Sequence, residues 1–249
     1  MRHVTSPPLS PAHPGAGVLP PTQPAELPFT LKMVRTEDQL ARICQLRSQA
    51  YGRHLPHMAA TLREPEAVDR EPGVVSFMAE DKASGLVVGT MRVHLNAHRA
   101  LPIESVLTLP DDLRGHLLVE VCRLAIRPGY NNHLVRLALF KALYLYSYAH
   151  QAQYMVVAAR RPLNEIYKAL GFKPANGGAE EQWIELPYAA SVPHSMLKFD
   201  VVVAERTWYE MAHPLYQFMV RTFHPDIRVF SAVSPAWHTP RASDRTVMA

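Results

Sequence analysis

The chain has 249 residues, a length that suits one large domain with extensions or at most two domains. Hydrophobic residues make up 48% of the chain, which is enough to build a core, and the net charge of +4 comes with no long run of Lys or Arg. A nucleic-acid-binding protein is therefore the least favoured class. The two cysteines, Cys44 and Cys122, lie within apolar patterns, which indicates reduced thiols in a reducing compartment rather than a disulfide framework.

No early apolar segment resembles a signal peptide, and no run approaches the ~18 apolar residues of a membrane span. Residues 1–28 hold eight prolines and few aromatic or branched aliphatic side chains, so we expect them to be disordered. We predict a cytoplasmic protein with one domain over residues 29–223 and an irregular tail over residues 224–249.

The ordered part begins with a predicted strand at 29–34. Thr36, followed three residues later by Gln39, is the pattern of a capping box and predicts a helix that runs to about Tyr51. Arg47 falls within the apolar stripe of this helix. It either forms a structural ion pair or faces a pocket, and the pattern alone does not decide between them.

Alternating residues predict a hairpin of strands 74–80 and 86–95 around the turn DKASG, with Thr90, Arg92 and His94 on one face of the second strand. Residues 52–72 read as loop and 96–116 as irregular or partly helical. Further strands are expected at 117–126, 154–159, 182–186 and 196–204, and helices at 134–150, 162–172 and 205–223, the last interrupted at Pro214. This order predicts a mixed α/β sheet with helices on both faces, the strand at 154–159 being a buried parallel neighbour.

The strand LLVEVCRLAI carries two charged residues, Glu120 and Arg123, among apolar ones. On a regular strand Glu120 shares a face with Cys122, Leu124 and Ile126, so burial should raise the pKa of its carboxyl group, unless it pairs with an arginine. Arg123 then points to the opposite face, and both residues could serve one site only if the strand bulges.

The order of elements and the segment NEIYKALGF resemble the GNAT acyltransferases. The loop RPGYNNHLVR has a single glycine, which departs from the Gly-rich loop that cradles the pyrophosphate of CoA in that superfamily. LRSQAY, GTMRV, EVCRLAI and YKALGF resemble, in order and spacing, the long-chain N-acyl amino acid synthases of the FeeM type, which are related to the acyl-homoserine lactone synthases. The resemblance covers residues 30–205.

The resemblance implies transfer of a long-chain fatty acyl group from acyl carrier protein to the amine of an amino acid. It implies catalytic roles for Glu120 as base, Tyr167 as general acid and Arg92 as partner of Glu120 or of a substrate carboxylate. Backbone amides around Cys122 and Leu124 would form an oxyanion site if the strand bulges.

Substrate-binding and carrier-binding residues complete this expectation. Substrate-binding residues would be Arg47, Arg123, Tyr144 and Tyr148, although core packing is the favoured role of the two tyrosines. Carrier-binding residues would be Arg127, His133, Arg136, Arg160 and Arg161. The donor group is a 4'-phosphopantetheine delivered on the carrier protein, with acyl-CoA as the less favoured donor. We expect no bound cofactor, and because the 13 histidines show no tight ligand spacing, no metal.

Three other functions remain open. An acyl-homoserine lactone synthase would use S-adenosylmethionine, but that subfamily has a tryptophan shortly after the first-helix arginine, and residues 48–72 contain none. An acyl-CoA-dependent GNAT enzyme and a non-catalytic binding module on the same scaffold are the others. The acylated amino acid and the acyl-chain length stay undetermined.

Overall fold

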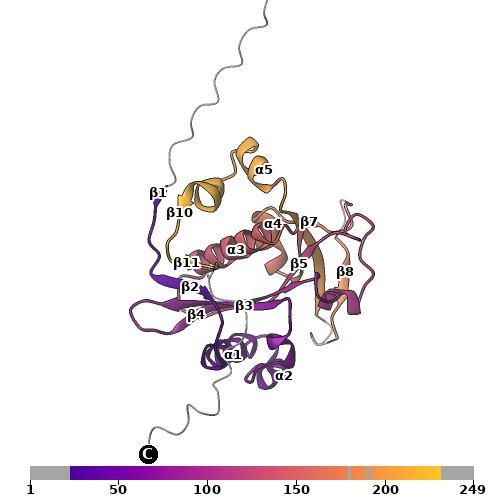
Figure 1. Cartoon of the computed structure of the whole chain (residues 1–249). Coiled ribbons are helices and arrows are strands. Elements are labelled where there is room, and N and C mark those ends of the chain that lie inside the picture. The colour runs from indigo at the N-terminus through magenta and orange to yellow at the C-terminus, as the bar shows by residue number, and fades with distance from the viewer. Residues whose placement is uncertain (1–22, 179–180, 188, 190–191, 231–249) are drawn as a thin grey trace, which may run out of the picture.

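The computed structural model describes residues 23–178, 181–187, 189 and 192–230 (Figure 1). Of the segment predicted to be disordered, residues 1–22 lie outside the described part, and so do residues 231–249 of the predicted tail. Gln23–Pro24 form a short strand, β1, which pairs in parallel with β10 at Thr222–Phe223.

The main sheet has nine strands, and its order is β11-β2-β3-β4-β5-β6-β9-β7, with β8 also pairing with β9. The β5–β6 and β11–β2 pairs are parallel, and the remaining pairs are antiparallel, which confirms the predicted mixed sheet. The strands are β2 Phe29–Met33, β3 Val74–Asp81, β4 Val87–Leu95, β5 Leu118–Ile126, β6 Tyr154–Arg160, β7 Lys173–Pro174, β8 Trp183–Glu185, β9 Pro193–Asp200 and β11 Ile227–Arg228.

Helices cover both faces of the sheet. In Figure 1, α1 and α2 lie on one face, while α3, α4 and α5 lie on the other. The helices are α1 Glu37–Tyr51, α2 Pro56–Thr61, α3 Asn132–Ala149, α4 Leu163–Ala169 and α5 Ala204–Glu210, with short 3-10 turns η1 at Ala67–Arg70 and η2 at Pro102–Ser105 and a π-helical turn η3 at Gln217–Arg221. None of the described helices is long and apolar enough to cross a membrane.

The predicted start of α1 is confirmed, with one change in the capping box. The Thr36 hydroxyl accepts from the Gln39 N–H at 3.2 Å, as predicted. The Gln39 side chain accepts at 2.8 Å from the N–H of Arg35 rather than that of Thr36. Both bonds satisfy backbone N–H groups at the start of α1, which have no preceding helical turn to supply a carbonyl acceptor.

The two faces of β4 meet different surroundings, as its alternation predicts. Met91, Val93 and Leu95 pack into the main core beneath α3, which is itself buried along most of its length. Thr90, Arg92 and His94 are also buried, but on the face that α1 covers. The face beneath α3 is therefore apolar, whereas the face beneath α1 combines these buried polar residues with an apolar cluster.

Strands β5 and β6 pair over only three positions, the last being Glu120 opposite Val156. Beyond this point each strand continues, to Ile126 and to Arg160, without a shared register. The helices that follow them, α3 and α4, then cover the sheet face opposite α1. The sheet thus opens next to Glu120.

Strand β5 also bulges at the point where the strands separate. Cys122 lies opposite Arg92 and Ala125 opposite Thr90, so β5 has one residue more than β4 across this interval. Arg123 takes a φ of 54°, a left-handed conformation that breaks the strand alternation. Beyond the bulge the faces are exchanged: Leu124 and Ile126 pack against the main core, not on the face of Glu120 that a regular strand predicts.

Two segments differ from the predicted pattern. The loop at 52–72 contains α2 and η1, and α2 begins at Pro56, whose fixed φ suits the first helical position. The strand predicted at 196–204 ends at Asp200, because the Asp200 carboxylate accepts the N–H groups of Val202 and Val203 and turns the chain into α5.

Candidate active site

A cavity of about 320 Å³ lies where β5 and β6 separate. Residues 121–126 of β5 and 157–160 of β6 form two of its walls. The end of α1 at Ala50 and Tyr51, the following Leu55, and Arg136 and Tyr167 from the opposite face complete much of the lining. The cavity is therefore bounded by elements from both faces of the sheet.

Glu120 lies at the point of separation, one residue before the wall that β5 contributes. It is 4% exposed, and its Oε2 accepts the N–H of Ile103 at 2.9 Å. Burial raises the pKa of the Glu120 carboxyl group to about 8, while the Ile103 N–H acts in the opposite sense. No described arginine or lysine forms an ion pair with it.

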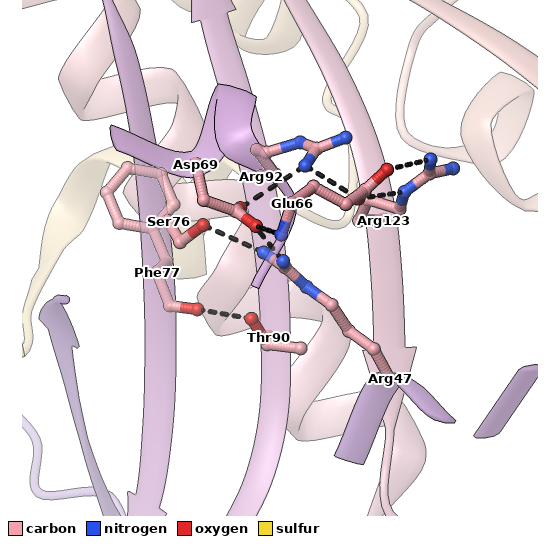
Figure 2. A network of polar contacts seen from close by, with 8 residues as sticks. All are labelled: Arg47, Glu66, Asp69, Ser76, Phe77, Thr90, Arg92 and Arg123. Carbon is pink, nitrogen blue, oxygen red and sulfur yellow. Dashed lines mark hydrogen bonds and ion pairs between the residues drawn. The ribbon is translucent and has the colours of Figure 1, made fainter. Parts of the chain in front are cut away.

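Three arginines and two carboxylates form a largely buried network, which Figure 2 shows from close by. Arg47 Nη1 contacts Asp69 at 2.9 Å, and Arg92 Nη1 contacts both Asp69 at 3.2 Å and Glu66 at 2.8 Å. Arg123 binds both oxygens of Glu66, through Nε at 3.0 Å and Nη2 at 2.9 Å. Together the three guanidinium groups link α1, β4 and β5 to the two carboxylates at η1.

The network holds its two carboxylates ionised. Burial alone would raise the pKa of Glu66, but hydrogen bonds and charge from Arg123 and Arg92 outweigh it and lower that pKa to about 2. The pKa of Asp69 is also lowered, since Arg47 and Arg92 outweigh the effect of burial. Glu120 has no such partner, so the same face of the sheet holds ionised carboxylates beside one with a raised pKa.

The bulge brings Arg123 to the side of the sheet that carries Arg92, since both bind Glu66. Arg123 also lines the cavity, as Cys122 does. Arg47, in contrast, is fully buried and outside the cavity lining, where Asp69 and the Ser76 hydroxyl, at 2.8 Å, hold it. Arg92 likewise forms its ion pairs with Glu66 and Asp69, and among the described residues it forms none with Glu120.

Glu66 and Asp69 are site residues that the sequence analysis did not assign. They lie in the segment read as loop, where no periodicity points to a role. Their one recognisable feature is a spacing of three residues across a single turn, in which the Glu66 N–H donates to Asp69 at 2.9 Å. Ion pairing with arginines far along the chain is what gives them a place in the site.

Tyr167 of α4 is buried and lines the cavity. Burial raises the pKa of its phenol, and nearby Tyr51 adds to the rise, whereas the Arg136 guanidinium opposes it. The phenol is therefore protonated throughout the neutral range and can serve as a donor.

Tyr144 and Tyr148 lie away from the cavity lining. The Tyr144 ring packs against Trp208 at 5.3 Å and Phe199 at 6.4 Å, and Tyr148 is 64% exposed. Both belong to the face of α3 that meets α5 and β9.

The cavity lining is cationic. Among the described residues it contains Arg53, Arg123, Arg136 and Arg160 with His54 and His194, and no Asp or Glu. Within the same part of the chain Arg136 and Arg160 form no ion pair, and the Arg136 Nε is buried without a hydrogen-bond partner.

The remaining predicted carrier-binding residues lie outside this lining. Arg127 donates to the Val87 carbonyl at 2.8 Å, Arg161 lies over the Trp183 ring at 4.9 Å, and His133 is exposed. The described residues contain no group of three His, Cys, Asp or Glu side chains that could hold a metal ion.

Known proteins share this fold. FeeM, an N-acyl amino acid synthase from uncultured soil microbes, superposes with a TM-score of 0.58 at 15% identity, covering 77% of this chain and 97% of its own. BjaI, a CoA-dependent acyl-homoserine lactone synthase, gives 0.52 at 15% identity, with 81% and 95% covered. TofI gives 0.52 at 14% identity, with 69% and 90% covered.

No curated protein matches the chain in sequence. The model of the family "N-acyl amino acid synthase FeeM" matches residues 42–186, which is more than half of the chain and includes the whole polar network, Glu120 and Tyr167. The chain therefore belongs to the FeeM family, and it is an acyltransferase of the GNAT fold that moves an acyl group from a donor to an amine.

Proposed function

We propose that the protein is an N-acyl amino acid synthase that transfers a long-chain fatty acyl group from acyl carrier protein to the amine of an amino acid. The observation that carries the proposal is the buried Glu120 carboxyl group, with a pKa raised to about 8, beside a cavity lined by Tyr167 and several arginines, of which Arg136 and Arg160 form no ion pair with any described residue. Membership of the FeeM family supports the same reaction.

The first step is loss of a proton from the acceptor. An amino acid arrives mainly as an ammonium ion, which has no lone pair to attack a thioester. Glu120, as carboxylate, takes one proton from this nitrogen, directly or through a water molecule. A pKa near the operating pH allows the group both to accept the proton and to release it afterwards.

The amine nitrogen then attacks the thioester carbonyl carbon, and the carbonyl oxygen becomes an oxyanion. The backbone of β5 from Cys122 to Leu124 is the candidate oxyanion site, since the bulge interrupts its register with β4 and its pairing with β6 has already ended. The C–S bond breaks as the intermediate collapses. The Tyr167 hydroxyl protonates the departing thiolate, and the nitrogen loses its second proton to restore the phenol.

The cationic lining supports a donor that carries phosphate and an acceptor that carries a carboxylate. Arg136 and Arg160 can hold the phosphate of a 4'-phosphopantetheine arm, and the exposed His133 and Arg161 with the half-buried Arg127 can meet the acidic face of a carrier protein. Arg123, the network member that lines the cavity, can receive the carboxylate of the acceptor. Arg92 and Arg47 act through Glu66 and Asp69, which fix Arg123 and the strands around it.

Mass spectrometry of lipid extracts tests the reaction. Cells expressing the wild type are compared with cells expressing Glu120→Gln, which keeps the shape of the side chain. New N-acyl amino acids that disappear in the variant support both the reaction and the base, and their masses name the amine and the acyl length. The same products in both strains would contradict the role of Glu120.

Activity assays with purified protein then distinguish between the possible donors and acceptors. We expect turnover with long-chain acyl-acyl carrier protein and the amino acid identified in the extracts, and at least about tenfold less with the matching acyl-CoA. Faster turnover with acyl-CoA would show that acyl-CoA, and not the acyl carrier protein, is the donor. Formation of an acyl-homoserine lactone from S-adenosylmethionine would show that S-adenosylmethionine, and not an amino acid, is the acceptor.

A further inference from the structure

His94 is a buried histidine whose ring has no hydrogen bond within the described residues. It lies in β4 and is 1% exposed, and neither Nδ1 nor Nε2 has a partner there. A neutral imidazole offers one N–H donor and one acceptor nitrogen, and leaving such groups unpaired in a core costs free energy. A strand that only had to pack would carry an apolar residue here.

The side chain directly across the sheet from His94 is Glu120. The two residues are register partners of β4 and β5, so their side chains leave the same face with Cβ atoms about 4.5–5.5 Å apart. On β3 the position opposite His94 is Val74, which cannot hydrogen-bond to the ring through its side chain.

Other charged groups near the ring already have partners of their own. They are Arg92 of β4, Asp69 of η1 and Arg123 of β5, which are joined in the buried network. Burial lowers the pKa of His94 to about 4, and the charge of Arg92 adds to this effect. The ring is therefore neutral under the conditions in which Glu120 titrates, and it can donate one N–H.

We propose that His94 is the positioning residue of Glu120: its ring, which has no hydrogen bond to any described residue in this structure, turns so that a ring N–H donates to the Glu120 carboxylate when that group is ionised, and the bond holds the carboxylate in the orientation that receives the proton of the acceptor amine. The catalytic consequence rests on the proposed function, while the pairing of the two side chains does not. In the proton step an N–H bond of the acceptor breaks and an O–H bond forms on Glu120, and the ring keeps its own proton.

This pairing has a consequence that mere packing would not have. A donor to the carboxylate stabilises the ionised form and offsets part of the effect of burial. Without it, a smaller fraction of Glu120 is ionised near neutral pH. The ring thus tunes the pH at which Glu120 becomes a base.

Titration of Glu120 tests the pairing of His94 with Glu120 without an activity assay. Infrared difference spectra follow its carboxyl C=O band, which Glu120→Gln identifies by removing it. In His94→Phe, which fills the space without a donor, we expect the transition about one pH unit higher, a tenfold change in ionisation. It should stay near the wild-type value in His94→Gln, which keeps an N–H, and in His194→Phe, which removes another buried histidine of the cavity wall.

An unchanged titration in folded His94→Phe would overturn the proposal. Thermal unfolding establishes that each variant is folded, and His94→Val, a smaller residue suited to a strand, replaces His94→Phe if that variant is not.

Kinetics test the link to catalysis. With acyl-acyl carrier protein and the accepted amino acid, His94→Phe should lose about tenfold in kcat/KM at pH 7, recover above pH 9, and be rescued by His94→Gln. In a Glu120→Gln background the same change should cost nothing further. An equal loss in both backgrounds would overturn the positioning role. If instead the titration shifts but Glu120→Gln is as active as the wild type, the pairing stands and Glu120 is not the base.

Discussion

Glu120 differs from the other carboxylates of its face in one respect, which is the lack of a cation. Asp69 is buried and Glu66 is half-buried, but arginines keep both ionised with lowered pKa values. Glu120 accepts a backbone N–H from Ile103 and has no ion-pair partner among the described residues, so burial decides its pKa. A carboxyl group with a raised pKa and an ion-pair network can therefore lie within one strand of each other and titrate in opposite directions.

The activity should depend on pH through Glu120. Below a pKa of about 8 the carboxyl group is protonated and accepts no proton from the substrate. We expect kcat/KM to rise about tenfold per pH unit at lower pH and to level off above pH 8. Rates measured from pH 6 to pH 9.5 check this, and a profile that is flat across the range would contradict it.

Loss of Asp69 should be costly for stability. In Asp69→Ala the fully buried Arg47 loses its ion-pair partner, and an unpaired buried charge costs about 3–5 kcal/mol in the free energy of unfolding. Glu37→Ala is the matched control, because it removes the carboxylate of the exposed Glu37–Arg70 pair and should cost less than about 1 kcal/mol. Denaturant unfolding of both variants measures the difference; equal costs would show that burial of the network is unimportant.

The residues that the sequence singles out are those that break a pattern. Glu120 and Arg123 interrupt an apolar strand, and Arg47 interrupts an apolar helix face, so each is visible without a structure. Glu66 and Asp69 lie in a polar, proline-containing segment in which two acids are unremarkable. The Arg123–Glu66 contact spans 57 residues of chain, and a single sequence contains no information on such pairing.

At the level of elements, the bulge in β5 decides which residues share a site. A regular strand would send Arg123 to the face opposite Glu120, as its spacing predicts. The extra residue between Cys122 and Ala125, with the left-handed φ of Arg123, turns its guanidinium toward Glu66 instead. The need for a bulge could be predicted from the sequence, but its outcome for Leu124 and Ile126 could not.

Gly89 sets how closely α3 approaches the sheet. A Cβ atom added there would overlap Val135 Cγ1 and lie 3.2 Å from Leu139 Cδ1, so Gly89→Ala must push α3 outward. We expect a loss of about 1–3 kcal/mol in unfolding free energy, together with reduced activity because the neighbouring Arg136 moves with the helix. Thermal unfolding and kcat/KM of Gly89→Ala measure both effects.

A second substitution gives this prediction its control. Val135→Ala removes the overlapping methyl groups, so the double variant should regain part of the stability that Gly89→Ala loses, relative to Val135→Ala alone. If the two losses simply add, the contact between Gly89 and Val135 does not set the position of the helix.

Long elements could be predicted from the sequence and short ones could not. The hairpin, β5, α1 and α3 follow from alternation or helical spacing over many residues. Strands β1, β10 and β11 have two residues each and exist only because distant segments meet, Gln23 with Thr222 and Leu31 with Ile227. No periodicity can appear in two residues.

At the scale of the whole molecule, one buried lysine binds the segment 217–224 to the core helix α3. Lys141 of α3 donates to the Phe218 carbonyl at 2.8 Å and the Thr222 carbonyl at 2.5 Å, and its Nζ lies 3.0 Å from His224 Nδ1. Burial lowers the pKa of Lys141 to about 8. The bonds hold η3 and β10 against the same helix that carries Arg136.

Lys141→Met keeps the length of the side chain but leaves two carbonyl groups without their donor. We expect a loss of about 2–4 kcal/mol in unfolding free energy and faster hydrogen exchange over residues 217–224. Lys32→Met, which breaks a half-exposed pair with Glu80, should change stability by less than about 1 kcal/mol. Unchanged exchange over 217–224 in Lys141→Met would contradict the anchoring role.

The early end of the β5–β6 pairing leaves a short seam of backbone pairing in the middle of the sheet. Seven register pairs join β6 to β9 and seven join β3 to β4, but only three join the two halves across β5 and β6. Few backbone hydrogen bonds therefore cross this seam, and the side chains of the main core hold its two sides together. Glu120 belongs to the last pair of the seam, so the residue proposed as base has a backbone that is still paired with β6, while the part of β5 just beyond it lines the cavity.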